Sequence, residues 1–150
     1  IIIMKKYLFL LSVLLSATSL HSHAAPEVLP LKTKAMQTMT LDSIPPYRAE
    51  DVLKGTGENW LNILHRGEII VAIYEAKPAL INIQNPFPYD EFVMVLEGQV
   101  TLTHINGQAQ TYNKGDNFLV PKGFLGTWDM PELYREMIVI ETKAFSATKD

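Results

Sequence analysis

From Trp60 to Thr142 the chain is a succession of short apolar or alternating segments separated by turn-forming residues. Alternation of apolar and polar residues gives a strand one inner and one outer face, so this pattern predicts strands rather than helices. Asn106-Gly107 favours the positive dihedral angles of a tight hairpin. Many short strands at this spacing predict an all-β sandwich or barrel. The predicted strands cover residues 62–66, 69–76, 80–84, 91–96, 99–104, 108–112, 117–120, 125–129 and 135–142.

The N-terminal residues have the pattern of a signal peptide. Lys5 and Lys6 precede an apolar run over residues 7–15, and Ser22-His23-Ala24 places small residues at the first and third positions before a cut after Ala24. An uncleaved membrane anchor is the alternative, but a span needs about 20 mostly apolar residues and polar residues interrupt this run earlier. We therefore expect a signal peptide over 1–24, no stable membrane anchor after its cleavage, and a periplasmic or secreted protein.

The remaining chain, residues 25–150, has a length that suits one domain. Residues 25–59 have weak periodicity and predict an extended N-terminal lead-in, with an edge strand at 36–41 and a short helical turn at 49–54. The predicted domain proper covers residues 60–150.

Charge and cysteine content exclude several classes of function. Without Lys5 and Lys6, 11 of the 13 basic residues remain against 16 acidic ones, which gives a formal charge of −5. No basic stripe is left for a phosphate backbone, so we expect no nucleic-acid partner. The absence of cysteine excludes disulfides, thiolate metal sites and a cysteine nucleophile.

Two segments carry more information than their periodicity. Residues 89–98 (YDEFVMVLEG) and 115–128 (GDNFLVPKGFLGTW) resemble the two cupin motifs, and the similarity spans about 69–141. GFLGTW at 123–128 in particular resembles cupins related to ureidoglycine aminohydrolases. The resemblance implies a cupin-type jelly-roll β-barrel, also called a double-stranded β-helix.

The resemblance also implies a metal site of three histidines and one glutamate, but most of these ligands are missing. Residues 84–87 read Gln-Asn-Pro-Phe where a histidine pair is expected, and Gly126 replaces the last histidine. Only Glu91 of the four remains. His65 and His104 lie outside both motifs. We therefore predict no metal site and no cofactor.

A nonstandard divalent metal held by carboxylates is the alternative to a metal-free site. Asp90, Glu91 and Glu97 are the available carboxylates. Alternation opposes this arrangement, because Asp90 and Glu91 point to opposite faces of a strand.

Strand alternation also predicts the residues of a ligand pocket. Glu91 and Val93 share the face that the resemblance directs inward, and Gly126 and Trp128 share a face of their own strand. A buried glutamate beside an indole has a raised pKa and suits a general acid or base. The predicted pocket residues are Tyr89, Glu91, Val93, Gly126 and Trp128, with Glu91 as the catalytic candidate. The candidate partners of Glu91 are Tyr89, Lys122, Tyr134 and Arg135. The alternative is that both residues have only a structural role. Glu91 then accepts backbone hydrogen bonds, and Trp128 only fills the core.

Two classes of function follow from these features. The first is an exported module that binds a small-molecule ligand in an aromatic-lined pocket, where Glu91 gives polar selectivity. The second is an enzyme that acts on a small nitrogenous or carbonyl substrate, as ureidoglycine aminohydrolase-type cupins imply, with Glu91 as acid, base or metal ligand. Residues 92–96 are apolar on both strand faces, so we also expect an outer face covered by a second subunit in a homodimer.

Overall fold

The computed structural model describes residues 25–147, and the predicted signal peptide over residues 1–24 lies outside the described residues. Residues 25–30 contain no helix or strand, and every described element belongs to the unit that begins at Leu31. The helices are α1 (Thr33–Thr38), the 3₁₀ turn η1 (Ala49–Asp51) and α2 (Thr142–Ala147). Within the described part of the chain, no helix has the length and apolar character of a membrane span.

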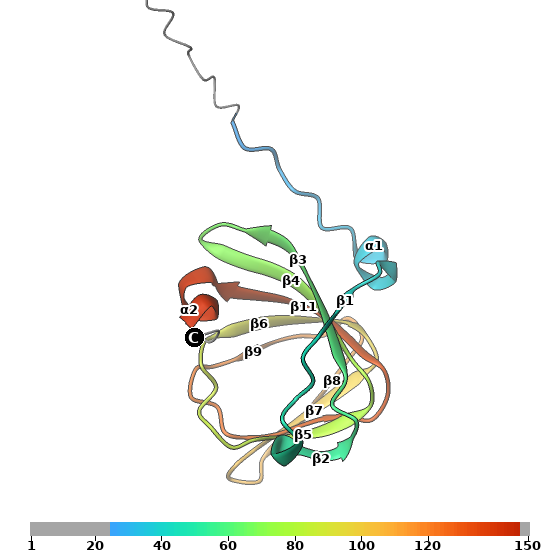
Figure 1. Ribbon diagram of the computed structural model, residues 1–150, viewed down its shortest axis with the longest axis vertical. Coiled ribbons are helices and arrows are strands. Elements are labelled where there is room, and N and C mark those ends of the chain that lie inside the picture. Colours follow the sequence, from blue (N-terminus) through green and yellow to red (C-terminus); the bar gives the residue numbers. More distant parts are fainter. Residues whose placement is uncertain (1–24, 148–150) are drawn as a thin grey trace, which may run out of the picture. The chain divides into compact units, whose positions relative to one another are not determined.

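The strands form two antiparallel sheets that face each other (Figure 1). The six-stranded sheet has the order β1 (Asp42–Ile44), β3 (Asn59–Arg66), β4 (Ile69–Ala76), β11 (Tyr134–Glu141), β6 (Glu91–Glu97) and β9 (Asn117–Val120). The five-stranded sheet has the order β2 (Val52–Gly55), β5 (Ala79–Ile83), β10 (Gly126–Met130), β7 (Gln99–His104) and β8 (Ala109–Asn113). This architecture confirms the predicted all-β jelly-roll barrel.

The core lies between the two sheets because alternate residues of each strand point inward. Val93 and Val95 of β6 are almost fully buried there, and Ile138 of β11 and Trp128 of β10 belong to the same apolar cluster. Strand β11 is central to the six-stranded sheet, since it pairs with β4 along its whole length and with β6 on its other side. Side chains on the inner faces of β6 and β11 are therefore held in a rigid framework.

A second apolar cluster covers the outer face of the six-stranded sheet. Met36 of α1 packs there against Leu96 of β6 and Met137 of β11. The guanidinium of Arg135 donates hydrogen bonds to the carbonyls of Met36 and Met39 at 3.0 Å each, at the end of the helix. Helix α1 thus covers part of the face that the sequence predicted to be covered by a second subunit, and the homodimer stays a prediction.

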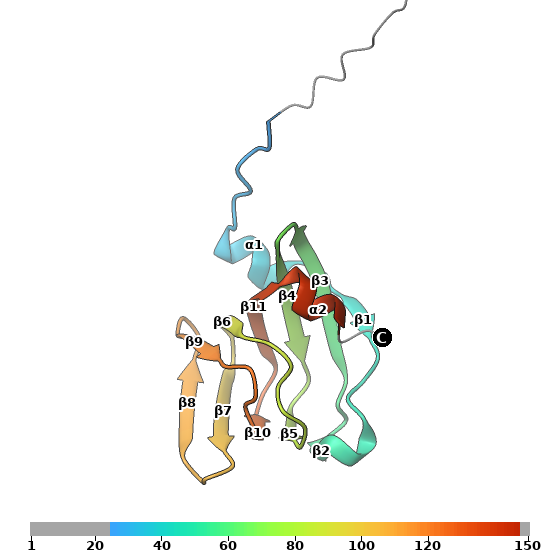
Figure 2. The same cartoon turned by 90° about the vertical axis from the view of Figure 1, so that its left-hand side faces the viewer.

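All nine predicted strands are present. Three have the predicted bounds, namely β4, β7 and β9, and the ends of the others differ by up to three residues. Figure 2 shows β7 and β8 side by side at one edge of the five-stranded sheet, where the hairpin at Asn106-Gly107 joins them. Alternation was sufficient to predict the positions of these strands, because each of them has one buried face.

The N-terminal and C-terminal elements differ from the prediction. The edge strand predicted at 36–41 is wrong: residues Thr33–Thr38 form a helix, because Met36 packs on the sheet and Arg135 binds the helix end. The helical turn predicted at 49–54 is present only as η1, and the chain continues into β2. The strand predicted to end at Thr142 gives way there to α2, which packs against β4 and β11.

Candidate binding cavity

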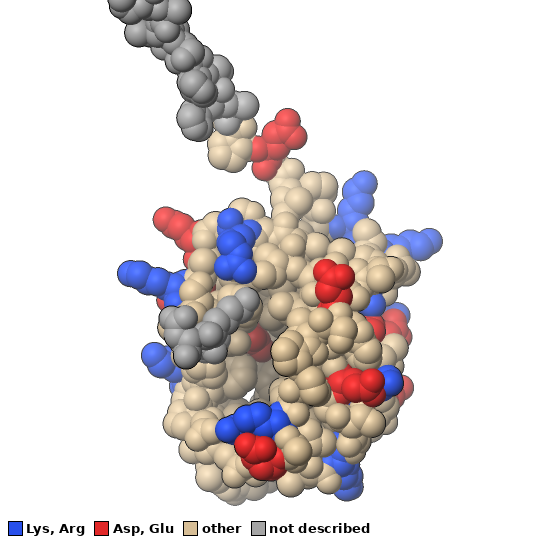
Figure 3. Space-filling model, in the orientation of Figure 1, with Lys and Arg blue, Asp and Glu red and all other residues tan. Residues whose placement is uncertain are grey.

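A cavity of about 410 Å³ opens between the two sheets. Apolar and aromatic side chains make up most of its wall, and two acidic side chains reach it from the six-stranded sheet. Figure 3 shows the hollow on this face of the molecule, with acidic atoms visible at its depth. The lining residues are Ile44, Pro45, Tyr47, Leu61, Tyr74, Ile83, Phe87, Tyr89, Glu91, Trp128, Glu136, Ile138 and Phe145.

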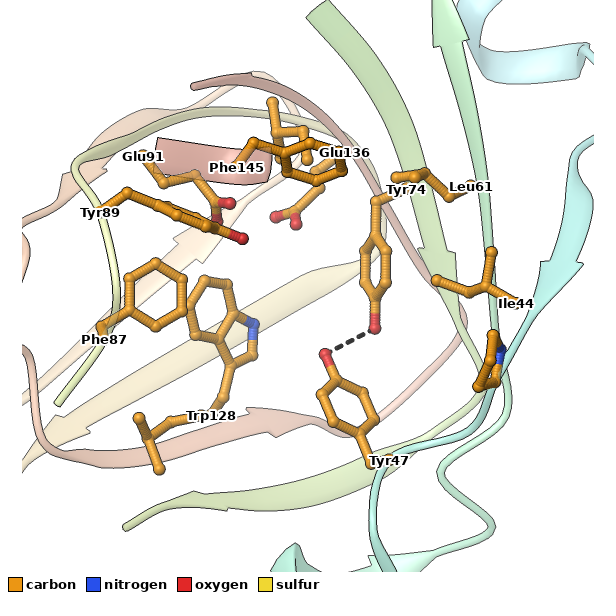
Figure 4. A pocket seen from close by; sticks show the side chains of 13 residues that line it. Ile44, Tyr47, Leu61, Tyr74, Phe87, Tyr89, Glu91, Trp128, Glu136 and Phe145 are labelled. Carbon is orange, nitrogen blue, oxygen red and sulfur yellow. Dashed lines mark hydrogen bonds between the residues drawn. The ribbon is translucent and has the colours of Figure 1, made fainter. Parts of the chain in front are cut away.

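Glu91 and Glu136 come from neighbouring strands and point into the same part of the cavity (Figure 4). Glu91 is the first residue of β6 and shares its inner face with Val93. Glu136 lies on the inner face of β11 beside Ile138. Their exposed fractions are 5% and 3%, respectively, so both residues are largely buried.

The two carboxyl groups differ in their hydrogen bonds. The Tyr134 hydroxyl donates to Oε2 of Glu136 over 2.5 Å, whereas Glu91 has no hydrogen-bond partner among residues 25–147. Burial, and then the nearby carboxyl of Glu136, raise the pKa of Glu91 well above its ordinary value. Burial also raises the pKa of Glu136, and the hydrogen bond from Tyr134 opposes this shift. The pair therefore retains protons at pH values where exposed carboxyl groups have lost them.

Aromatic rings form much of the remaining wall. The Tyr47 and Tyr74 hydroxyls are hydrogen bonded over 2.7 Å. The ring of Phe87 stacks on that of Trp128 at a centroid distance of 6.2 Å and meets the ring of Tyr89 edge-on at 5.3 Å. Burial is the largest cause of the raised pKa of the Tyr47, Tyr74 and Tyr89 phenols, which thus stay neutral at physiological pH. They offer hydroxyl groups to the cavity without adding negative charge.

Three of the five predicted pocket residues line this cavity: Tyr89, Glu91 and Trp128. Val93 shares the inner face of β6 but is fully buried in the core and does not reach the cavity. Gly126 is also absent from the wall, because its backbone lies against that of Thr103 in β7 and a Cβ atom at this position would overlap with the Thr103 carbonyl oxygen.

Of the predicted partners of Glu91, only Tyr89 lines the cavity with it. Tyr134 binds Glu136 instead. Arg135 points to the opposite face of β11, where it forms an ion pair with Glu75 at 2.7 Å. Lys122 is exposed and does not contribute to the wall.

The residues present do not fit the histidine-rich metal site of typical cupins. Among residues 25–147 no three His, Cys, Asp or Glu side chains are grouped closely enough to hold a metal ion. His65 and His104 are exposed and lie on different sheets. Gly126 has no room for a histidine side chain.

Sequence reasoning missed Glu136, Tyr47, Tyr74 and Phe145. Glu136 could have been found, because it is a single acidic residue on the inward face of a strand that was predicted correctly apart from its ends. Tyr47 comes from the lead-in and Phe145 from α2. No local pattern indicates that these two segments close over the barrel.

Comparison with known proteins agrees with this fold. Residues 69–137 match the family described as the EutQ-like cupin domain. No curated protein matches the sequence. The ethanolamine utilization protein Q of Salmonella typhimurium LT2 is 24% identical with a TM-score of 0.50, over 57% of this chain and 70% of that one. The EutQ protein of Clostridium difficile is 18% identical with a TM-score of 0.54, over 69% and 80%.

A protein of unknown function from Pseudomonas syringae pv. tomato, assigned to the DUF861 family, has a TM-score of 0.61 at 20% identity. The similarity covers 69% of this chain and 45% of the Pseudomonas protein. At such identities these structures are evidence for the fold. The family match covers β6, which carries Glu91, and the first part of β11, which carries Glu136. Residues 69–137 are therefore similar to the EutQ-like cupin domain, and the solved structures agree with a cupin-type fold for this chain.

Proposed function

We propose that the chain is a small-molecule-binding cupin domain whose ligand occupies the barrel cavity and contacts Glu91. The observation that carries this proposal is the state of Glu91, which is only 5% exposed, faces the cavity and has no hydrogen-bond partner among the described residues. No fully enclosed side-chain oxygen among the described residues lacks a partner, so the unbonded carboxyl oxygens of Glu91 open to the cavity. A polar group in such a poorly hydrated cavity gains from a directed partner. A ligand that hydrogen-bonds to Glu91 provides one.

The size and chemistry of the cavity support the same function. Its volume of about 410 Å³ lies within the range of roughly 300–1,000 Å³ that small-molecule sites occupy. Its wall combines a largely apolar surface with a few polar groups that converge on one region. This combination is typical of sites that select a ligand by shape and by one or two directed contacts.

Chemical-shift mapping by NMR tests the proposal. We expect small organic compounds to shift the indole N–H of Trp128 and the resonances of Tyr89, and Glu91→Gln to weaken this binding. Glu97→Gln is the matched control, because Glu97 lies on the same strand but is exposed and paired with Lys114. The proposal fails if a chemically diverse set of compounds leaves the cavity resonances unchanged.

An enzyme acting on a small nitrogenous or carbonyl substrate is the second candidate function. The coupled carboxyl pair favours it, since raised pKa values allow one carboxyl group to deliver a proton and later recover it near neutral pH. In this case Glu91→Gln retains ligand binding but loses turnover. Elemental analysis of the purified chain and of Glu91→Ala tests the metal-free site: stoichiometric metal that disappears in the variant contradicts it.

For localisation, we propose export to the periplasm or beyond, as the signal peptide pattern at residues 1–24 indicates. Mass spectrometry of the protein purified from an extracytoplasmic fraction is expected to show a chain that begins at Ala25. A chain in the cytoplasm that retains residues 1–24 contradicts the proposal.

A further inference from the structure

The cavity contains two carboxyl groups but no basic side chain. None of its lining residues is Lys, Arg or His. Buried carboxylates normally have a cationic partner or a full set of hydrogen bonds, because transfer from water to a low-dielectric interior is unfavourable. Among the described residues, the pair receives one hydrogen bond, from Tyr134 to Glu136.

The basic side chains of neighbouring segments lie elsewhere. Arg135 is adjacent in sequence to Glu136 but lies on the other face of the sheet with Glu75. The guanidinium of Arg66 lies 5.9 Å from the centre of the Phe145 ring, but this arginine is exposed and does not line the cavity. The cationic partner of the two buried carboxyl groups is thus missing from the described chain.

The aromatic rings around these carboxyl groups would also stabilise a bound cation. Tyr47, Tyr74, Phe87, Tyr89, Trp128 and Phe145 surround the space that Glu91 and Glu136 face (Figure 4). The face of an aromatic ring is electron-rich and attracts a cation, most strongly in a desolvated site, and such rings recognise organic ammonium groups. Because the phenols are neutral, they add hydroxyl oxygens as hydrogen-bond acceptors without adding negative charge.

We propose that the ligand of this cavity is a small organic ammonium ion, whose charged nitrogen lies against Glu91 and Glu136 and whose hydrocarbon part packs among the aromatic rings. This inference rests on the proposed small-molecule-binding function and names the class of its ligand.

Other ligand classes fit the same wall less well. A divalent metal ion prefers six or more oxygen ligands or several nitrogen and sulfur donors, and two carboxyl groups with neutral phenols do not provide such a set. An anionic ligand is repelled by Glu91 and Glu136 once they are ionised. A neutral ligand can accept or donate a hydrogen bond there, but it brings no charge to balance the ionised groups.

The experiment uses three compounds of the same shape and different charge: phenethylamine, 2-phenylethanol and phenylacetate. Calorimetric titration of the purified chain at about pH 8, where the alkylammonium is still protonated, is expected to show binding of the amine. We expect its affinity to exceed those of the alcohol and the acid by at least about tenfold, as a desolvated cation–π and carboxylate contact implies.

Three variants assign the selectivity to the carboxyl pair. Glu91→Gln and Glu136→Gln keep the shape of each side chain, and in Glu136→Gln the new amide oxygen still accepts the hydrogen bond of Tyr134. Both are expected to reduce amine affinity at least about tenfold and to reduce the weak binding of the alcohol by much less. Glu97→Gln, the exposed control on β6, is expected to bind the amine as the native chain does.

Proton release gives an independent readout. An ammonium ion that binds the ionised pair displaces protons from it, so the apparent affinity for the amine should rise between about pH 6 and pH 8. The other titratable groups facing the pair are the phenols of Tyr47, Tyr74, Tyr89 and Tyr134, all of which stay protonated over this range. Titrations in two buffers of different ionisation enthalpy measure the protons released.

The outcomes separate this inference from the function on which it rests. If the alcohol or the acid binds as tightly as the amine, the cavity is a small-molecule site but the ammonium class is wrong. If none of the three compounds binds, the inference of an ammonium ligand is again wrong. The NMR screen with diverse compounds then tests the proposed small-molecule binding on its own. Amine selectivity that persists in both glutamine variants also overturns the inference.

Discussion

Gly126 is the first residue of β10, and its Cα lies close to the backbone of Thr103 in β7. A Cβ atom added there overlaps with the carbonyl oxygen of Thr103, and the φ of +153° disfavours any L side chain. We predict that Gly126→Ala lowers the free energy of unfolding by about 3 kcal/mol or more, because the pairing of β10 with β7 must shift. Denaturant unfolding measures this loss.

Gly107→Ala is the control for this prediction. Gly107 also has a positive φ, of +89°, but no atom lies within 4 Å of an added Cβ. Its replacement should cost only about 1–2 kcal/mol through backbone conformation. Equal losses in the two variants would show that contact with Thr103 is unimportant. A histidine at residue 126 would meet the same overlap with the Thr103 carbonyl oxygen.

Tyr134 gives a second prediction at the scale of single atoms. Its hydroxyl donates the hydrogen bond that Glu136 accepts, and both residues are buried. Tyr134→Phe leaves Glu136 without this donor, so we expect a loss of about 1–3 kcal/mol in unfolding free energy and a further rise in the pKa of Glu136.

Tyr112→Phe removes the same atom from an exposed hydrogen bond with Gln110 and keeps the stack on Phe118. Thermal unfolding should show a much smaller change for this control. A Tyr134→Phe variant as stable as the control would mean that the Glu136 carboxyl does not need its donor.

The candidate site could be predicted from the sequence where strand alternation governs it. Alternation placed Glu91 on an inner face, and the same rule applied to the last strand places Glu136 there too. Alternation also placed Val93 on the inner face. However, it cannot distinguish an inward residue that packs in the core from one that lines the cavity. Gly126 was assigned to the pocket from a motif position, and only the spacing of β7 and β10 excludes it.

At the scale of elements, helix α1 depends on a contact that is remote in sequence. Arg135 joins Glu75 of β4 to the carbonyls of Met36 and Met39. Arg135→Met leaves the partly buried Glu75 without its cation and α1 without its anchor, so we expect stability to fall by about 3 kcal/mol. Hydrogen exchange should show the first loss of protection in the amides of α1, including that of Met36, which bonds to Lys32.

Lys77→Met is the control for this ion pair. Lys77 pairs with Glu58 at the same distance of 2.7 Å, but both side chains are nearly half exposed. Its removal should change stability far less than that of Arg135, because an exposed ion pair is screened by water. A similar small effect for Arg135→Met, with α1 still protected, would show that the packing of Met36 alone holds the helix.

Helix α1 also shows which part of the fold could not be predicted from the sequence. The strands have a buried face that leaves a period of two in the sequence, and this is why their positions were predictable. Helix α1 has six residues and buries one of them, Met36, so it has no comparable period. Helix α2 is equally short, and its buried residue is Phe145. Tertiary contacts, rather than local propensity, determine both helices.

For the molecule as a whole, the proposed binding cavity lowers the stability of the empty barrel. Two carboxyl groups in an interior without a cation reduce the stability of the folded state, and proteins commonly retain such features where function requires them. A bound ligand that stabilises only the folded state offsets this loss in proportion to its concentration. The stability of the empty barrel should therefore record the titration of Glu91 and Glu136.

The sign of this pH dependence follows from the direction of the two pKa shifts. Both pKa values are raised in the folded protein, so the folded state binds more protons than the unfolded chain above the ordinary pKa of glutamate, near 4.3. The stabilising effect of these protons is complete below that value and is lost as the pH rises through the raised pKa values. Glu58 has the opposite shift, because its hydrogen bond with Lys77 lowers its pKa. Its contribution to the pH dependence of stability therefore falls in the acid range.

We therefore predict that the free energy of unfolding, measured with urea, falls between about pH 5 and pH 8, by up to about 1.4 kcal/mol per pH unit for each proton that the folded state loses. Glu91→Gln and Glu136→Gln should each flatten this slope and be more stable than the native chain near pH 8, whereas Glu97→Gln should follow the native curve. A native stability that is constant or rises over this range would mean that the pair is solvated or neutralised within the folded chain. Because an ammonium ligand requires the ionised pair, phenethylamine should restore stability most strongly at the alkaline end of the range, where the empty barrel is weakest.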